Sequence, residues 1–174
     1  MVLNPVRWSF RSLMVLAGLL CFALVAYAYY LQTVQGLDPC PLCIFQRIGF
    51  ISVGIVSVLA ALQNPARLGR RIYGVLGMLA SIAGGSVAAR HIWLRHLPAD
   101  QVPACGPGLD FMLEAFPIGK TLKTVFTGSG ECAQSDGWFL LGLDMPSWAL
   151  IAFVGLLLSM GFAGFRAKGK DSAK

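Results

Sequence analysis

The sequence predicts an all-α membrane protein: a bundle of four transmembrane helices. Three observations predict this fold: an apolar composition, four long and nearly uncharged runs, and basic residues gathered at the ends of those runs. Of the 174 residues, 56% are hydrophobic and 13% are charged, and the mean hydropathy is +0.69. A soluble domain has about 25% charged and about 45–50% apolar residues. The composition therefore excludes an ordinary soluble domain and intrinsic disorder.

Four runs are long enough to cross a bilayer core of about 30 Å, which takes about 20 mostly apolar residues in a helix. We expect the spans at about 12–31, 44–62, 72–89 and 148–165. The only charged residue within them is Arg47, in the first turn of the second span. Each span must be helical, because a lone strand would leave its backbone groups unpaired in lipid. The whole chain, 1–174, is then a single integral membrane domain.

Basic residues predict the orientation, because loops rich in Lys and Arg tend to stay in the cytoplasm. Most of them lie before the first span, between the second and third, or after the fourth: Arg7, Arg11, Arg67, Arg70, Arg71, Arg166, Lys168, Lys170 and Lys174. We therefore expect both termini and a loop at about 63–71 in the cytoplasm, and loops at about 32–43 and 90–147 outside. The net charge of +6 does not indicate nucleic-acid binding, because the charges flank apolar runs instead of forming one basic face.

The first run has a competing interpretation as a cleavable signal peptide. Arg7 and Arg11, an apolar stretch and the small-residue pattern at 26–28 fit that interpretation. The apolar run continues through 29–31, which favours a transmembrane span. Cleavage would not reverse the orientation of the remaining spans.

The second outer loop, 90–147, is long for a connection between packed helices, and such loops are usually functional. Within it, Ile118, Leu122, Val125 and Phe126 recur at i, i+4, i+7 and i+8. This spacing predicts a short interfacial helix lying flat on the membrane. A loop packed against the bundle fits the same residues.

Four of the five cysteines fall in the two outer loops: Cys40 and Cys43 in the first, Cys105 and Cys132 in the second. Disulfides form and persist in oxidising compartments such as the bacterial envelope. Cys21 lies inside the first span, where a thiol acts as a small apolar side chain. The distribution therefore indicates disulfide chemistry on the outer side of the membrane.

Cys40-Pro41-Leu42-Cys43 is a C-x-x-C motif at the outer mouth of the second span. Pro41 suits the first turn of a helix, so Cys43 lies where free N–H groups and the helix dipole favour a thiolate. Arg47 follows four residues later on the same face and should favour the thiolate further, although it could equally be an arginine snorkelling to water. No second close cysteine pair occurs, so we expect no metal site. Ile44 in place of His excludes a c-type haem.

Cys105 and Cys132 both lie in glycine-containing segments, 103–108 and 128–132. A disulfide joining two pliable segments would be of the labile, exchanging kind, and the alternative is a plain structural staple. Two vicinal thiols at the membrane surface and two in a loop predict a relay that passes a disulfide to a soluble partner.

The ordered motifs, 40–47 (CPLCIFQR), then Cys105 and Cys132, then 142–148 (GLDMPSW), resemble the DsbB family of bacterial disulfide bond formation proteins. The resemblance runs from about Trp8 to Phe165. It implies an enzyme of the bacterial inner membrane, with its active cysteines on the periplasmic side. Such an enzyme reoxidises a DsbA-like periplasmic thiol oxidase and passes two electrons to quinone, either ubiquinone or menaquinone.

The resemblance also implies residue roles. Cys40–Cys43 is the quinone-linked disulfide, and Cys105–Cys132 is the disulfide that exchanges with the partner. Cys105 takes the mixed disulfide, and Cys132 then attacks Cys40. Cys43 contacts the quinone, and Arg47, His91 and Met145 line its site. Two features depart from the family pattern: Cys21 is an additional cysteine, and Arg90 and Arg95 add positive charge beside His91.

The energetics of the implied reaction require a strong electron acceptor. DsbA has a potential of about −120 mV, whereas structural disulfides lie below about −300 mV and cannot oxidise it. Two alternatives stay open at the level of sequence. One is a four-span protein with purely structural outer disulfides, and the other is a quinone-linked thiol oxidase dedicated to another substrate protein.

Overall fold

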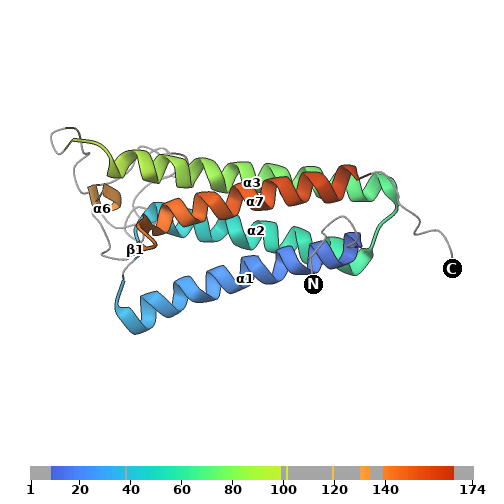
Figure 1. The fold of residues 1–174 in the computed structure, drawn as a ribbon, viewed down its shortest axis with the longest axis horizontal. Helices are drawn as coiled ribbons and strands as arrows, with labels where there is room; N and C mark the ends of the chain where they lie inside the picture. Colours follow the sequence, from blue (N-terminus) through green and yellow to red (C-terminus); the bar gives the residue numbers. More distant parts are fainter. Residues whose placement is uncertain are drawn as a thin grey trace.

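Four long helices form the molecule (Figure 1). The computed structural model describes residues 9–37, 39–98, 101, 119, 130–133 and 139–166. The long helices are α1 (Phe10–Gln35), α2 (Pro41–Gln63), α3 (Arg67–Arg95) and α7 (Met145–Phe165). Each contains one of the predicted spans, and all four are long and apolar enough to cross a membrane. The predicted all-α bundle of four such helices is therefore confirmed.

Two parts of the sequence prediction fall on residues that the structure does not describe. They are Cys105 and, apart from residue 119, the predicted interfacial helix at about 118–126. Both stay predictions.

Local sequence sets where the helices begin and end. The Ser9 side chain accepts a hydrogen bond from the Ser12 amide at 3.2 Å and so caps the start of α1. Gly36 ends α1 in the left-handed conformation, with φ of 65°, which glycine adopts without steric cost. Pro41 occupies the first turn of α2, as its missing N–H predicts.

The helices extend beyond the apolar runs that predicted them. α3 covers Arg67–Arg95, whereas the uncharged run covers 72–89. The added turns carry arginines at both ends of α3. Arginine has a high helix propensity, and its long side chain can reach water from a helix end that is still close to lipid. A span inferred from uncharged residues alone is therefore shorter than the helix.

A short hairpin leads into α7 and was not among the predicted elements. Its strands, β1 (Phe139–Leu140) and β2 (Leu143–Asp144), pair antiparallel. The two turn residues, Leu141 and Gly142, have φ of 53° and 78°, the positive values of a tight hairpin turn. The hairpin and the short helix α6 (Gly130–Ala133) lie at the end of the bundle where α2 begins (Figure 1). We call this the cysteine end.

Close approach of α3 and α7 holds the bundle together. A Cβ atom placed on Gly74 would lie 2.8 Å from the Gly164 Cα, so the two backbones meet where neither residue has a side chain. Such small-residue contacts are the usual means of packing helices in membranes. Near mid-bundle, the Phe50 and Phe153 rings stack with centroids 4.1 Å apart. These contacts fix α7 against α2 and α3, and hence the position of the cysteine end.

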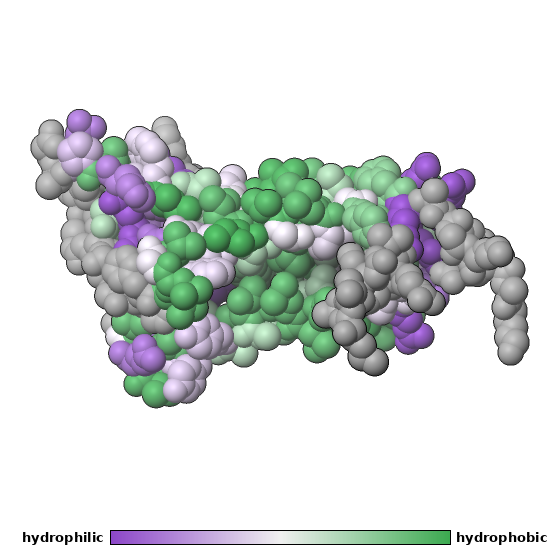
Figure 2. Space-filling model, in the orientation of Figure 1, coloured by the Kyte–Doolittle hydropathy of each residue, from purple (hydrophilic) through white to green (hydrophobic). Residues whose placement is uncertain are grey.

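The face of the bundle seen in Figure 2 is mostly apolar along its middle and carries hydrophilic residues towards both ends. Large aliphatic side chains project outward from all four helices, among them Leu19, Leu62, Leu79 and Leu158. A soluble protein buries most such side chains in its core. A surface of this kind suits a lipid environment.

Candidate active site

Cys40 and Cys43 lie together where α2 begins. Cys40 is the residue before the first helical turn, and Cys43 is in that turn. Their Sγ atoms are 3.2 Å apart, and both thiols are free in the structure. The spacing of the motif and Pro41 determine this geometry, because three residues bring the two side chains onto one side of the helix start. The Cys40–Cys43 disulfide stays a prediction.

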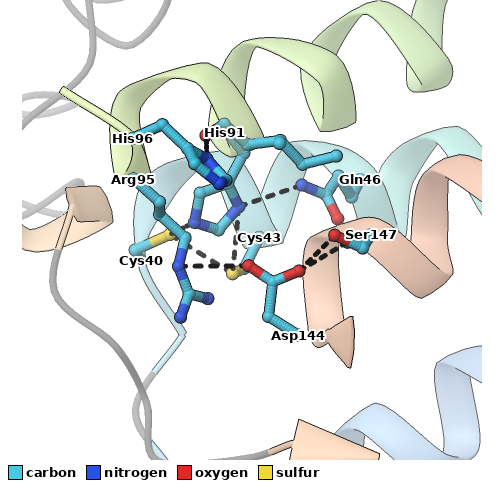
Figure 3. Close-up of polar contacts among 9 residues, drawn as sticks. Cys40, Cys43, Gln46, His91, Arg95, His96, Asp144 and Ser147 are labelled. Carbon is cyan, nitrogen blue, oxygen red and sulfur yellow. Dashed lines mark hydrogen bonds and ion pairs between the residues drawn. The ribbon is translucent and has the colours of Figure 1, made fainter. Parts of the chain in front are cut away.

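His91, near the C-terminal end of α3, faces both sulfurs (Figure 3). Its Nε2 lies 3.9 Å from Cys40 Sγ and its Nδ1 lies 4.0 Å from Cys43 Sγ. Gln46, one turn into α2, places its Nε2 at 3.1 Å from His91 Nδ1. His91 is 1% exposed and Gln46 is 5% exposed. A buried amide therefore fixes the orientation of a buried imidazole against the two thiols.

A cavity of about 450 Å³ lies between α1, α2 and α7, beside Cys43. Its walls are mostly apolar side chains, including Leu24, Leu31, Phe50, Trp148 and Ile151. Cys43, Gln46 and Arg47 supply polar groups, and Met145 also lines it. Small-molecule sites typically have this size and this mixture of apolar walls with a few polar groups. The described residues that line the cavity do not include His91. His91 contacts two of them, Cys43 and Gln46.

The Arg47 side chain spans from α2 to α1. Its Nη1 donates to Gln32 Oε1 at 2.6 Å, and its Nη2 donates to the Ala28 carbonyl at 3.3 Å. The guanidinium carbon lies 5.0 Å from the centre of the Tyr29 ring. These contacts hold a fixed positive charge at the wall of the cavity, which Cys43 also lines.

Cys132, in α6, is buried beside the C-x-x-C motif. It is 1% exposed and belongs to an apolar cluster with Leu42, Val87 and Leu94. Cys40 packs against the same cluster. The structure therefore brings the Cys132 segment, from the second outer loop, to the side of the site that holds Cys40. Cys105 lies outside the described residues, so its pairing with Cys132 stays a prediction.

An ion pair joins α3 to the start of α7. Arg95 Nε lies 3.3 Å from Asp144 Oδ2, and the two side chains are only 8% and 11% exposed. Asp144 also caps α7 by accepting hydrogen bonds from the Ser147 amide, at 3.2 Å, and from the Ser147 hydroxyl. Burial would raise the pKa of Asp144, but the Ser147 hydrogen bonds and the Arg95 charge outweigh it and lower the pKa. The Asp144 carboxylate thus neutralises the charge of Arg95, one of the two arginines that depart from the family pattern.

Several groups around the site had no predicted role. Gln46 belongs to the motif at 40–47, but a glutamine in an apolar run does not reveal which residue it will meet. Gln32 and Asp144 are distant in sequence from their arginine partners, so local spacing gives no signal for either contact. Cys21 is fully buried in the bundle core, as an apolar side chain would be.

The chain is similar to known proteins over nearly its whole length. Residues 10–163 match the family described as "Disulfide bond formation protein DsbB". A relative from Saccharophagus degradans, named disulfide bond formation protein B, is 50% identical over 155 residues, which cover 89% of this chain and 92% of the relative. The proteins of the same name from Xanthomonas euvesicatoria and Methylococcus capsulatus are 47% identical over 167 residues (95% and 96% covered) and 50% identical over 148 residues (85% and 90% covered).

A family match over most of the sequence, together with relatives near 50% identity, establishes the family. The C-x-x-C pair at the start of α2 and the four apolar helices agree with it. The chain belongs to the DsbB family of disulfide bond formation proteins, and it is a disulfide-forming thiol oxidoreductase.

Proposed function

We propose that the protein reoxidises a DsbA-like periplasmic thiol oxidase and passes the two electrons to quinone in the bacterial inner membrane. Membership of the DsbB family implies a periplasmic thiol-oxidase partner. The periplasm is known to be kept oxidising by a DsbA–DsbB–quinone relay. The choice between ubiquinone and menaquinone is left to experiment.

One observation carries this proposal: the C-x-x-C pair stands between two different environments. Cys40 packs against the buried cluster that contains Cys132. Cys43 lines the apolar cavity between α1, α2 and α7. A thiol pair placed in this way can receive electrons from a loop cysteine on one side and release them on the other.

The exchange steps use this chain's own sulfurs. A thiolate of the reduced partner attacks Cys105 of a Cys105–Cys132 disulfide, forming a mixed disulfide and releasing Cys132 as a thiolate. The second partner thiol then displaces Cys105, which leaves the partner oxidised. Cys132 attacks Cys40 of a Cys40–Cys43 disulfide and releases Cys43 as a thiolate, and Cys105 then attacks Cys132, which re-forms the Cys105–Cys132 disulfide and releases Cys40. Each step exchanges one disulfide for another, so the electron pair reaches Cys43 without other oxidants.

The cavity fits a quinone by size and chemistry. A quinone has a flat apolar ring with two carbonyl acceptors and an apolar tail. The wall offers apolar side chains from α1 and α7, and the Arg47 guanidinium can donate hydrogen bonds. When bound, a quinone would accept two electrons and two protons and so serve as the final electron acceptor for the cysteine pair.

Individual residues around the cavity have distinct proposed roles. Cys43 presents its sulfur to the cavity, and Arg47 balances the negative charge that builds up there. Met145, the first residue of α7, closes the wall near the cysteine end. His91 acts from behind the two sulfurs, where it contacts Cys40 and Cys43 and is held by Gln46.

The proposed orientation has both termini in the cytoplasm and the cysteine end in the periplasm. The terminal end of the bundle carries Arg67, Arg70 and Arg71 at the start of α3. Basic residues at this end favour its retention in the cytoplasm. The cysteine end then faces the oxidising compartment where its partner is found.

Mixed-disulfide trapping tests the relay in cells. In Cys132→Ser the free Cys105 thiolate attacks the disulfide of the oxidised partner, and because no loop thiol is left to displace the partner, a mixed disulfide with Cys105 should accumulate and be visible on a non-reducing gel. Cys105→Ser should trap nothing and should leave the partner reduced. Cys21→Ser is the matched control, since Cys21 is buried in the bundle core, and it should behave like the unmodified protein. Normal partner oxidation in both loop variants would refute the relay and leave the loop cysteines structural.

A further inference from the structure

Three side chains at the cysteine end offer metal-binding atoms at close quarters. Cys40, Cys43 and His91 each offer one ligand atom, and these atoms lie within 4.8 Å of one another. Figure 3 shows both sulfurs on the same side of the His91 ring. We propose that the reduced protein binds one borderline-soft divalent metal ion, of the Zn²⁺ type, through Cys40, Cys43 and His91.

The distances suit tetrahedral coordination. Zinc lies about 2.3 Å from thiolate sulfur and about 2.0–2.1 Å from imidazole nitrogen, which puts neighbouring ligand atoms roughly 3.5–3.8 Å apart. In the structure the two sulfurs are 3.2 Å apart and His91 Nε2 lies 3.9 Å from Cys40 Sγ, while the three ligand atoms, taken as one per residue, all lie within 4.8 Å of one another. Rotations about the side-chain torsions of Cys43 and His91 would bring all three atoms to a common ion. The fourth position stays open, as in zinc sites that exchange ligands.

Gln46 supplies the support that a metal-binding histidine needs. Such a histidine almost always donates its other ring N–H to an acceptor, which fixes the tautomer. The Gln46 amide lies at hydrogen-bond distance from His91 Nδ1. Rotating this amide by half a turn places Oε1 there, where it accepts the Nδ1 proton and leaves Nε2, beside Cys40, free to bind the ion. The two orientations of an amide differ only in which atom faces the ring.

The charge balance also favours a dication. Two thiolates and a neutral imidazole match the charge of M²⁺, and up to two thiol protons leave as the ion binds. The neighbouring arginines are engaged elsewhere: Arg95 pairs with Asp144, and Arg47 is bonded to α1. The sequence predicts no metal site, because it contains no second close cysteine pair. The third ligand instead comes from α3, 48 residues after Cys43.

Binding would depend on the redox state of the pair. A Cys40–Cys43 disulfide has no thiolates to offer, so only the reduced form takes the ion. A bound ion would in turn hold both sulfurs and prevent the disulfide from re-forming. External zinc would therefore arrest the enzyme in its reduced state. This consequence rests on the proposed function, whereas the binding itself does not.

Zinc titration of the purified full-length protein in detergent, freed of any tag, tests the proposal. Reduced protein should withdraw one Zn²⁺ per chain from a chromophoric chelator, and oxidised protein should withdraw none. Cys40→Ser and Cys43→Ser should each abolish tight binding. Gln46→Leu should weaken binding by about 10–100-fold, the usual effect of losing such a supporting hydrogen bond.

The histidines provide a matched pair of variants. His91→Gln should weaken zinc binding at least as much as Gln46→Leu. His96→Gln should not change it, because His96 is exposed at the same helix end and its Nδ1 lies 2.8 Å from the Ile92 carbonyl oxygen. His91→Cys should restore binding by supplying a third thiolate, which separates ligand loss from misfolding. Failure of the reduced protein to bind, or equal effects of His91→Gln and His96→Gln, would overturn the site. The zinc readout does not require partner or quinone, so it stands apart from the test of the relay.

Discussion

Arg47 on α2 donates a 2.6 Å hydrogen bond to Gln32 on α1, across the wall of the cavity that Cys43 also lines. The bond fixes a flexible cation at the place where the proposed chemistry deposits negative charge. It also connects two helices that diverge towards the cysteine end (Figure 1). Loss of the Arg47 side chain should therefore affect the binding of quinone.

Arg47→Ala should raise the KM for quinone about tenfold or more, because a hydrogen bond to a charged group contributes about 1.5–3 kcal/mol. Arg47→Lys should recover part of the loss, since lysine keeps the charge without the planar fork. Steady-state kinetics with a soluble quinone analogue measure both. Arg90→Ala is the control, because Arg90 stacks on Trp93 and does not line the cavity. Unchanged quinone kinetics in Arg47→Ala would leave Arg47 as an interfacial arginine only.

Asp144→Asn should lower the stability of the protein at neutral pH by about 1–3 kcal/mol, because Arg95 loses a charged partner. Asparagine caps helices about as well as aspartate, so the change isolates the charge. The folded-state pKa of Asp144 is lowered, so its contribution is present above the unfolded-state pKa of about 3.9 and is lost as pH falls below it. The difference in melting temperature between the two proteins should therefore shrink below about pH 4. A difference that stays constant from pH 7 to pH 3 would contradict the assignment.

Gly74→Ala should destabilise the bundle by about 1–3 kcal/mol, the usual cost of overpacking. The new methyl would lie 2.8 Å from the Gly164 Cα, and a backbone atom cannot move aside as a side chain can. Gly155→Ala on α7 is the matched control, because a Cβ at that position would meet nothing within 4 Å. Thermal unfolding in detergent compares the two variants. Equal melting temperatures would show that α3 and α7 are not held at this point.

Two exposed leucines at opposite ends of the bundle test the orientation. Leu141 is 85% exposed in the hairpin at the cysteine end, and Leu68 is 71% exposed at the start of α3. In a background with its native cysteines changed to serine, Leu141→Cys should react with a membrane-impermeant maleimide added to intact spheroplasts. Leu68→Cys should react only after the membrane is opened. The opposite labelling pattern would place the cysteine end in the cytoplasm, where a periplasmic partner could not contact it.

The sequence was sufficient for the bundle and for the main cysteines of the site. Nearly uncharged runs about as long as a bilayer crossing leave few alternatives to a helix, and each predicted range falls inside an observed helix. The C-x-x-C motif and Pro41 likewise determine the local geometry of Cys40 and Cys43. Both signals are local, and local signals are what a single sequence displays directly.

The contacts between distant segments were not accessible in this way. The Gln46–His91 and Arg95–Asp144 contacts each join two elements whose relative rotation depends on helix packing. The hairpin before α7 consists of two-residue strands, too short to give an alternating pattern. The bonds from Arg47 to α1 show the same limit. Its spacing indicated Cys43 as a neighbour, but its hydrogen bonds go to Gln32 and Ala28.

The central claim is that electrons from a soluble dithiol reach quinone through Cys43. The most direct measurement is an anaerobic absorbance titration of the purified, quinone-loaded protein with a reduced DsbA-like partner. We predict that the absorbance of oxidised quinone falls by one equivalent for each partner disulfide formed, and that Cys43→Ser abolishes this change. Oxidation of the partner in stoichiometric amounts while the quinone absorbance stays constant would contradict the claim.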